Sequence, residues 1–203
     1  MSQYRKDKKD DYVIILDYLP EGKAELTPYR KKPIAQAIGD KYFTIIEIAP
    51  RQGHSFDIGE RVYIGSEKRD KVDHIERRIR YEWLTPNAKS ELPVILVNIV
   101  KSNEAGFLRF YNTAGFLTPR QHQFERLPGV GKKISLALIH ERAKSPFKSF
   151  DDMHQRIKGM HDPAEIIADK IVRELSGESK YIFFLMRERD KKVVRDRRHR
   201  RDF

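Results

Sequence analysis

The amino-acid sequence predicts an α+β protein, with a β-rich N-terminal part followed by an all-α part. Residues 1–117 hold three or more short runs rich in β-branched and aromatic side chains, which are typical of strands. Residues 118–180 instead show helical apolar spacing between residues that commonly begin and end helices. An apolar run at 181–186 is expected to be a strand that pairs back onto the sheet. We therefore expect domains at 1–117 and 118–180, then an apolar strand and basic tail at 181–203.

The N-terminal part is expected to form a small barrel. Residues 12–19 are marked as a strand by their β-branched and aromatic content. Residues 34–38 and 42–48 flank a turn at 39–41 and predict a β-hairpin. Apolar and polar residues alternate over 61–65, which predicts another half-buried strand. Several short strands of this kind are typical of an OB-like β-barrel.

Two further segments of this part are predicted from apolar spacing. Residues 69–84 carry Val72, Ile75, Ile79 and Trp83 at helical spacing, so we expect a helix that ends at Thr85 before a proline. The apolar run at 92–100 can be a strand or a helix, because a short continuous run has no period that decides between them.

The most specific motif is the stretch Leu127–Lys133, which reads Leu-Pro-Gly-Val-Gly-Lys-Lys. Before it, Thr118 followed by Pro119 is typical of an N-cap and the first turn of a helix. After it, apolar residues recur at helical spacing from Ile134 to about Ala143. We therefore expect two helices that flank a tight turn.

The composition of this turn suits a phosphate contact. One glycine can take a backbone conformation closed to residues with a side chain, and the other allows a close approach of another backbone. Val130 between them can point inward, which leaves the N–H groups of the second helix facing an anion. The adjacent lysines add charge that positions a phosphate without reading bases. The predicted nucleic-acid contacts of the turn are Gly129, Val130, Gly131, Lys132 and Lys133.

The turn closely resembles the hairpin of helix-hairpin-helix nucleic-acid-binding modules, in which apolar-Pro-Gly-Val-Gly precedes basic or small residues. The resemblance covers roughly residues 118–143 and implies nucleic-acid binding. Two alternatives stay open: a helical hairpin used only for packing, and a degenerate copy that binds protein.

A second helical hairpin is expected further along the chain. Ser149 is the predicted N-cap of a short helix, and Asp162 followed by Pro163 is expected to begin a longer one. The turn between them keeps a single glycine, Gly159, and the Asp162 carboxylate would disfavour an anion. We therefore assign this hairpin a structural role and predict a tandem helix-hairpin-helix domain.

The charge balance points to an acidic polymer as the partner. Lys and Arg total 41 against 30 Asp and Glu, which gives a net charge of +11. Nine basic and four acidic residues fall in the tail at 181–203, so this segment is the most basic part of the chain. Beyond the hairpin, the candidate nucleic-acid contacts are Arg30, Lys31 and Lys32 in a loop, and Arg197 and Arg198 in the tail.

Aromatic residues could add stacking contacts to a nucleic acid. Tyr42, Phe43 and Tyr63 could stack on bases along an open barrel face, and Arg61 could add a cationic contact. The alternative, which we favour, is that these aromatic side chains belong to the core.

Composition also excludes several classes of site. The chain has no Cys, which rules out disulfides, thiolate zinc sites and a cysteine nucleophile. No run approaches the roughly 18–20 apolar residues of a membrane helix, and the charged N-terminus is unlike a secretory signal. We expect a soluble, cytoplasmic protein that contacts no membrane. Its seven His show no paired ligand spacing and no acidic cluster replaces them, so we expect no metal or other cofactor.

Catalysis is the rival class of function. Helix-hairpin-helix DNA glycosylases use an Asp beyond the hairpin, and Asp151 and Asp152 lie at a comparable place. Both fall in the first turn of the helix that Ser149 is expected to cap, where a carboxylate is ordinary. We therefore predict a non-catalytic protein.

The order of these parts resembles an archaeal family known as domain-of-unknown-function family 655, most clearly at Pro33–Pro50, Leu127–Lys133 and Ser149–Leu175. The resemblance implies an RNA- or DNA-binding protein linked to translation and rRNA modification, and it brings no catalytic residue. It favours RNA as the ligand and a ribosomal or transcription-machinery protein as a further partner, whereas the hairpin motif alone leans toward DNA. A DNA repair or replication accessory protein and a ribosome- or polymerase-associated adaptor stay open. The oligomeric state is not predicted.

Overall fold

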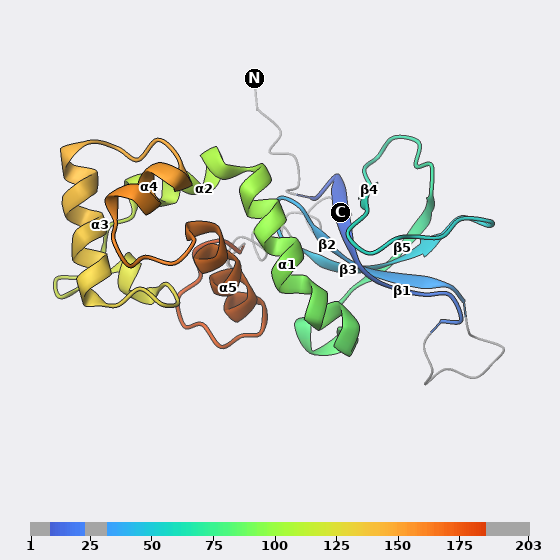
Figure 1. Cartoon of the computed structure of the whole chain (residues 1–203). Helices are drawn as coiled ribbons and strands as arrows, with labels where there is room; N and C mark the ends of the chain where they lie inside the picture. The colour runs from blue at the N-terminus through green and yellow to red at the C-terminus, as the bar shows by residue number, and fades with distance from the viewer. Residues whose placement is uncertain (1–8, 23–31, 186–203) are drawn as a thin grey trace, which may run out of the picture. The chain divides into compact units, whose positions relative to one another are not determined.

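The computed structural model describes residues 9–22 and 32–185 and shows a mixed α+β protein (Figure 1). Its described residues divide into two compact units, a sheet unit of residues up to 91 with 182–185, and a helical unit of residues 92–181. The division falls inside helix α1 (Pro86–Ser102), whereas the boundary expected from the sequence lies after residue 117. Each unit has its own buried apolar residues.

The sheet unit is built on five antiparallel strands that curl into a half-barrel (Figure 1). The strands are β1 (Tyr12–Leu19), β2 (Ile34–Gly39), β3 (Ile45–Pro50), β4 (Arg61–Tyr63) and β5 (Val72–Arg78). Their order in the sheet is β4-β1-β2-β3-β5, so β4 and β5 form its two edges. The predicted hairpin is confirmed, because β2 pairs antiparallel with β3.

Apolar residues from every strand meet on one side of this sheet. The core consists of Val13, Ile15, Ala35, Ala37, Ile46, Ile48, Phe56, Val62, Ile64 and Val72. Alternate positions of a strand point to opposite faces, so the period-2 segments predicted as strands can bury one face in this core.

The helix predicted over 69–84 is wrong. Val72–Arg78 forms the edge strand β5, and a single 3-10 turn (η2, Tyr81–Trp83) follows it. The apolar residues that suggested a helical stripe do not share a buried face, since Val72 is fully buried but Trp83 is 54% exposed. The pairing of β3 with β5 shifts register twice, and such bulges break the simple alternation by which a strand is recognised.

A buried polar network holds the segment after β5 against the sheet. The Asp17 carboxylate accepts hydrogen bonds from Thr85 Oγ1 at 2.6 Å and Asn87 Nδ2 at 2.9 Å. The Gln36 side chain accepts from Thr85 N at 2.8 Å and donates to Glu47 Oε1 at 3.2 Å. Thr85 also caps α1 (Pro86–Ser102), because its hydroxyl accepts from Ala88 N. Residues 92–100, which the sequence left open between strand and helix, lie inside α1 and are helical.

The helical unit continues from α1 through four further helices and the short elements between them. These elements are α2 (Glu104–Thr113), β6 (Phe116–Thr118), β7 (Gln121–His122), the 3-10 turn η3 (Gln123–Arg126), α3 (Lys132–Lys144), α4 (Phe150–Arg156) and α5 (Pro163–Leu175). The predicted caps of the second hairpin are confirmed: Ser149 Oγ accepts from Asp152 N at 3.0 Å, and Asp162 Oδ1 accepts from Ala164 N at 2.8 Å.

The helix predicted to begin at Thr118 is wrong. Residues 116–122 form the β6–β7 hairpin, and only the 3-10 turn η3 precedes the glycine motif. His122 caps that turn, with its Nδ1 accepting from Phe124 N while Glu125 Oε1 accepts from His122 N. Burial lowers the pKa of His122, and a nearby Arg142 adds to this effect, which favours the neutral ring that can accept. The cap signal therefore lies four residues later than Thr118.

The strand predicted at 181–186 is also absent from the described part of this segment. Residues 181–185 form bends rather than a strand, and Met186 lies outside the described residues. Lys170 Nζ donates to the Tyr181 carbonyl at 2.7 Å, so the start of the segment is tied to α5 by a side chain.

Candidate nucleic-acid interface

The Leu127–Lys133 turn has the backbone geometry expected of its glycines. Gly129 has a φ of +69°, which side-chain-bearing residues rarely adopt. Leu127 and Val130 are both buried in the helical unit. Val130 N donates to the Leu127 carbonyl at 3.2 Å and closes the turn. Val130 therefore points inward, and the outer side of the turn is left to backbone.

Gly131 lies at the N-cap of α3 and has a different role. Its backbone is extended, with φ −77° and ψ 176°, so any residue could adopt it. A Cβ placed on Gly131 would meet no atom within 4 Å among the described residues. The first four N–H groups of a helix have no acceptor within the helix, and no described side chain caps those of α3. The approach to these donors is open.

Positive charge surrounds this helix start. Lys132 and Lys133 are exposed, and the first turn of α3 carries no acidic residue. Within residues 9–22 and 32–185, neither lysine forms an ion pair, although other surface cations such as Arg173 do. Free donors, a helix dipole and two uncompensated ammonium groups make this a place where an oxyanion is stabilised.

The second turn, Ile157–Asp162, repeats the first one at its start and then differs. Ile157 and Met160 are buried like their counterparts Leu127 and Val130, and Gly159 has a φ of +81°. The N-cap of α5 is Asp162, whose carboxylate already occupies the helix start and lies 3.0 Å from Lys101 Nζ.

The Asp162 carboxylate favours its ionised form at the start of α5. Burial opposes ionisation, but hydrogen bonds from Lys101 and the Ala164 N–H outweigh it and lower the pKa of Asp162. A carboxylate that stays ionised repels a phosphate from the start of α5.

The other predicted contacts lie in the sheet unit or outside the described residues. Lys32 is exposed, whereas Arg30, Lys31, Arg197 and Arg198 lie outside the described residues.

Most of the predicted stacking residues are engaged within the fold. Phe43 is buried, as the favoured core interpretation requires. The guanidinium carbon of Arg61 lies 3.5 Å from the centre of the Tyr12 ring. Arg61 Nη2 also forms an ion pair with Asp40 Oδ2 at 2.8 Å. Tyr63 packs edge-on against Tyr12, and its hydroxyl accepts from Glu67 N.

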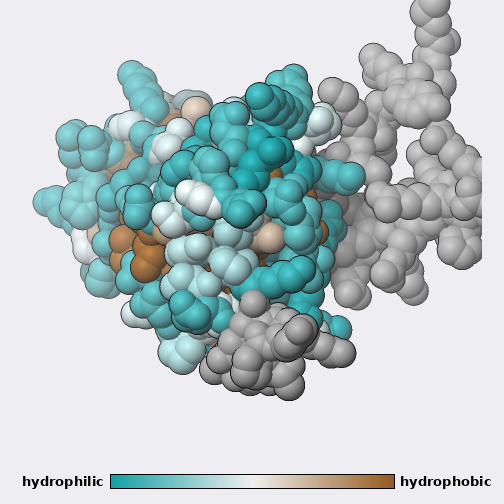
Figure 2. Space-filling view, turned by 90° about the vertical axis from the view of Figure 1, so that its right-hand side faces the viewer, coloured by the Kyte–Doolittle hydropathy of each residue, from teal (hydrophilic) through white to brown (hydrophobic). Residues whose placement is uncertain are grey.

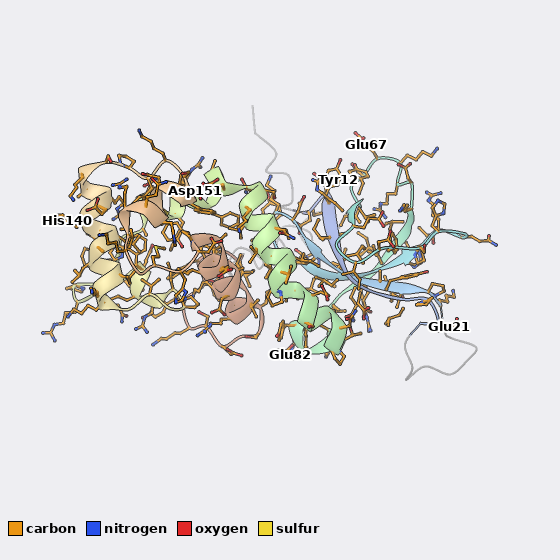
Figure 3. All side chains as sticks on the ribbon, in the orientation of Figure 1. Tyr12, Glu21, Glu67, Glu82, His140 and Asp151 are labelled. Atoms are coloured by element: carbon orange, nitrogen blue, oxygen red, sulfur yellow. The ribbon has the colours of Figure 1, made fainter. Side chains whose placement is uncertain are left out.

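The two aspartates considered for catalysis occupy the first turn of α4, where Figure 3 labels Asp151. Asp152 Oδ2 accepts from Lys148 N at 3.0 Å and from Arg156 Nη1 at 3.1 Å, so this carboxylate is engaged in holding the helix start. The described residues contain no cluster of three or more His, Asp or Glu side chains that could hold a metal ion. They also contain no helix that is long and apolar enough to span a membrane.

Comparisons with known proteins agree on one family. The model of the family described as protein of unknown function, DUF655, matches residues 9–186. The uncharacterized protein MJ0038 of Methanocaldococcus jannaschii is 41% identical over 181 residues, which cover 89% of this chain and 81% of that protein. The crystal structure of Af1531 from Archaeoglobus fulgidus, assigned to the same family, is 42% identical. It covers 87% of this chain and all of its own, with a TM-score of 0.81. The expected resemblance is thus confirmed, and the chain belongs to the DUF655 family.

Proposed function

We propose that this protein is a non-catalytic nucleic-acid-binding protein that holds phosphates at the Leu127–Lys133 turn. The observation that carries the proposal is the start of α3, where Gly131 leaves the helix without a side-chain cap and with open space around it. A phosphate oxygen could accept from the free N–H groups there, and Lys132 and Lys133 would add charge. The finer fold assignment, an OB-like half-barrel with tandem helix-hairpin-helix turns, belongs to the same proposal.

RNA is the proposed ligand, with a cytoplasmic location. This preference rests on the resemblance to family 655 described above, because a contact to phosphate alone does not separate RNA from DNA. DNA binding by a repair or replication accessory protein is the alternative that the hairpin motif favours. A ribosome- or polymerase-associated adaptor would bind protein at the same turn, so binding to bare nucleic acid separates it from both.

The test compares three variants of the full chain. Gly131→Val should fold, because its backbone is extended and a Cβ meets no neighbour, yet it should block the helix start. Lys132→Ala with Lys133→Ala should weaken binding to all sequences alike. Lys148→Ala with Lys158→Ala removes the same charge from exposed positions of the same unit and is the matched control.

Binding of each variant to duplex RNA, duplex DNA and single-stranded RNA is measured at three salt concentrations. For each phosphate that the variant no longer binds, the slope of log affinity against log salt should shrink by roughly 0.9 for duplex and 0.7 for single strands. The control pair should leave affinity and slope close to wild type. Unchanged binding by both Gly131→Val and the Lys132/Lys133 variant, with wild-type melting temperatures, would remove the hairpin from the function.

A further inference from the structure

A cavity of about 610 Å³ opens in the sheet unit, at the side where the half-barrel does not close. It lies between residues that follow β4 and residues of β5, the two edges of the sheet. Its lining comprises Lys9, Asp10, Asp11, Val13, Lys41, Tyr42, Thr44, Ile46, Ile64, Gly65, Ser66, Arg69, Ile75 and Arg78. We call this cavity the seam groove. In Figure 3, Tyr12 marks the start of β1 and Glu67 the loop after β4 that forms one wall.

Four cations line the seam groove, against two carboxylates. These cations are Lys9, Lys41, Arg69 and Arg78. In the part of the chain that the structure describes, none of the four is ion-paired; the Arg69 guanidinium donates to the Gly65 carbonyl instead. By contrast, Arg61 and Arg77 of the same unit each meet a carboxylate. The groove therefore holds an excess of positive charge that the described residues do not neutralise.

The mouth of the groove is held in place by Asp10. Its Oδ1 accepts from the backbone N–H groups of Lys41 at 3.0 Å and Tyr42 at 2.7 Å. Gly39 permits this contact, because a Cβ there would lie 2.1 Å from the Asp10 carboxyl group. Phe43, the next residue along the chain after Tyr42, is buried. The backbone of Lys41 and Tyr42 is thus fixed before a ligand arrives, which lowers the conformational entropy lost on binding.

The inner wall of the seam groove is apolar. Val13, Ile46 and Ile64 belong to the core of the sheet unit and are at most 6% exposed, so Ile75, which is 38% exposed, supplies most of the apolar surface that a ligand can reach. Figure 2 looks onto the sheet unit, where hydrophilic residues cover most of the surface and hydrophobic colour is confined to small patches. Cations around an apolar wall with one aromatic ring suit an amphipathic anion better than inorganic phosphate, which gains nothing from an apolar wall.

We propose that the seam groove binds a nucleotide unit of a single-stranded nucleic acid, with the base against Tyr42 and Ile75 and the phosphates at Arg69, Arg78 and Lys41. The proposal rests on the proposed function, which makes nucleic acid the ligand of the chain. A base can reach such a wall only when it is unstacked, so single strands are the expected form. The volume lies within the range of about 300–1,000 Å³ that is usual for small-ligand sites.

The test uses the full chain and three probes: fluorescein-labelled U12 RNA, a 12-base-pair RNA duplex of mixed sequence, and free UMP as a competitor. The groove variant is Arg69→Ala with Arg78→Ala. Its matched control is Arg51→Ala with Arg80→Ala, two exposed arginines of the same unit that do not line the groove. The groove variant should lower the salt slope for U12 by roughly 0.7 for each phosphate that it no longer binds, and leave binding of the duplex unchanged. The control should bind all three probes as wild type does.

A second pair of variants tests the base rather than the charge, in case the double arginine variant does not fold. Tyr42→Leu keeps apolar volume but removes the ring, and should weaken U12 binding roughly fivefold or more. Tyr42→Phe keeps the ring and should bind as wild type. If UMP competes with U12 on wild type and Tyr42→Leu abolishes this competition, a free nucleotide suffices for binding. If U12 binds and UMP does not compete, the groove is assigned to a strand.

The Lys132/Lys133 variant, measured alongside, separates this inference from the proposed function. Loss of U12 binding in the hairpin variant, with both groove variants unchanged, overturns the seam groove and leaves the hairpin standing. Loss of U12 binding in the groove variants alone, with binding of the duplex also unchanged in the Lys132/Lys133 variant, does the reverse. If wild type binds none of the three probes, or if no variant changes binding, both proposals fall.

Discussion

The two glycine turns of the helical unit share a packing plan and differ in chemistry. Leu127 and Ile157 are buried at equivalent places, and Gly129 and Gly159 both have positive φ. The helix start that follows is uncapped in the first turn and is occupied by Asp162 in the second. A turn of this kind therefore has two separable properties, a buried side that holds helices together and an outer helix start that can face an anion. Of these two turns, the first keeps its helix start free.

The largest expected effect tests the shared property. Leu127→Ala and Ile157→Ala should each lower the free energy of unfolding by about 2–5 kcal/mol, because each deletes a buried side chain and leaves a cavity. Leu127 is 4% exposed and Ile157 is 1% exposed, so the two costs should be similar. Urea unfolding followed by circular dichroism measures both. A cost well under about 1 kcal/mol at either residue would show that the turns do not pack alike.

The next effect separates the glycines within the first turn. Gly129→Ala must place a side chain at φ +69° and should cost about 1–2 kcal/mol. Gly131→Ala adopts an ordinary extended backbone with open space around its Cβ and should be close to neutral. Melting temperatures of the two variants check the difference. Equal costs would contradict the separate roles assigned to these glycines.

The sequence is informative about these turns because their signals are local. A glycine pair beside buried apolar residues, and Ser or Asp before a helix, act on neighbours within four residues, so Ser149 and Asp162 were predicted correctly as caps. Local signals also mislead when a stronger competitor lies nearby. Thr118 looks like an N-cap, but β6 pairs with β7 there and His122 caps η3 instead.

Non-local features could not be predicted in the same way. Val72–Arg78 has the spacing of a helix, and only its pairing with β3 makes it a strand. The cations of the seam groove stand at positions 9, 41, 69 and 78, so no single motif contains them. The curl of the sheet brings them to one cavity, and the antiparallel order β4-β1-β2-β3-β5 was not predicted from any motif.

A third prediction converts the first turn into the second. Gly131→Asp places a carboxylate at the α3 N-cap, whose extended backbone suits a capping residue. The variant should gain about 0.5 kcal/mol of stability, because the new side chain caps free N–H groups and complements the helix dipole. Its RNA binding should nevertheless fall, since the carboxylate occupies and repels the phosphate position.

The opposite directions of these two effects make Gly131→Asp a sharp variant. A melting temperature at or above wild type, measured with loss of affinity for duplex RNA, supports the comparison. Gly131→Asn is its control, because Asn caps nearly as well but carries no charge. The Gly131→Asn variant should therefore be as stable as Gly131→Asp and bind duplex RNA more tightly. Unchanged affinity in the Asp variant would mean that α3 does not face the ligand.

The smallest expected effect is the pH dependence of the stability that Asp162 contributes in the second turn. The pKa of Asp162 is lowered in the folded protein, so the unfolded chain binds a proton more readily than the folded one. The carboxylate therefore contributes its full stabilisation at pH values above 3.8, the pKa of Asp162 in the unfolded chain. This stabilisation is lost as the pH falls through the lower pKa of the folded protein. Asp162→Asn removes this titration while keeping an oxygen that can cap α5. The stability difference between wild type and Asp162→Asn should be constant from about pH 5 to 7 and should shrink below pH 3.8.

Unfolding at about pH 3, 4, 5 and 7 measures this difference across the titration of the carboxylate. The Lys101→Met variant, measured in parallel, identifies the partner, because Lys101 Nζ lies 3.0 Å from Asp162 Oδ2. In the Lys101→Met background, the stability difference between Asp162 and its Asn variant should be smaller at every pH at which the Asp162 carboxylate is ionised. A difference that grew on acidification would mean that burial destabilises the Asp162 carboxylate more than its partners stabilise it. The second helix start would then resemble the first in lacking a favourable occupant.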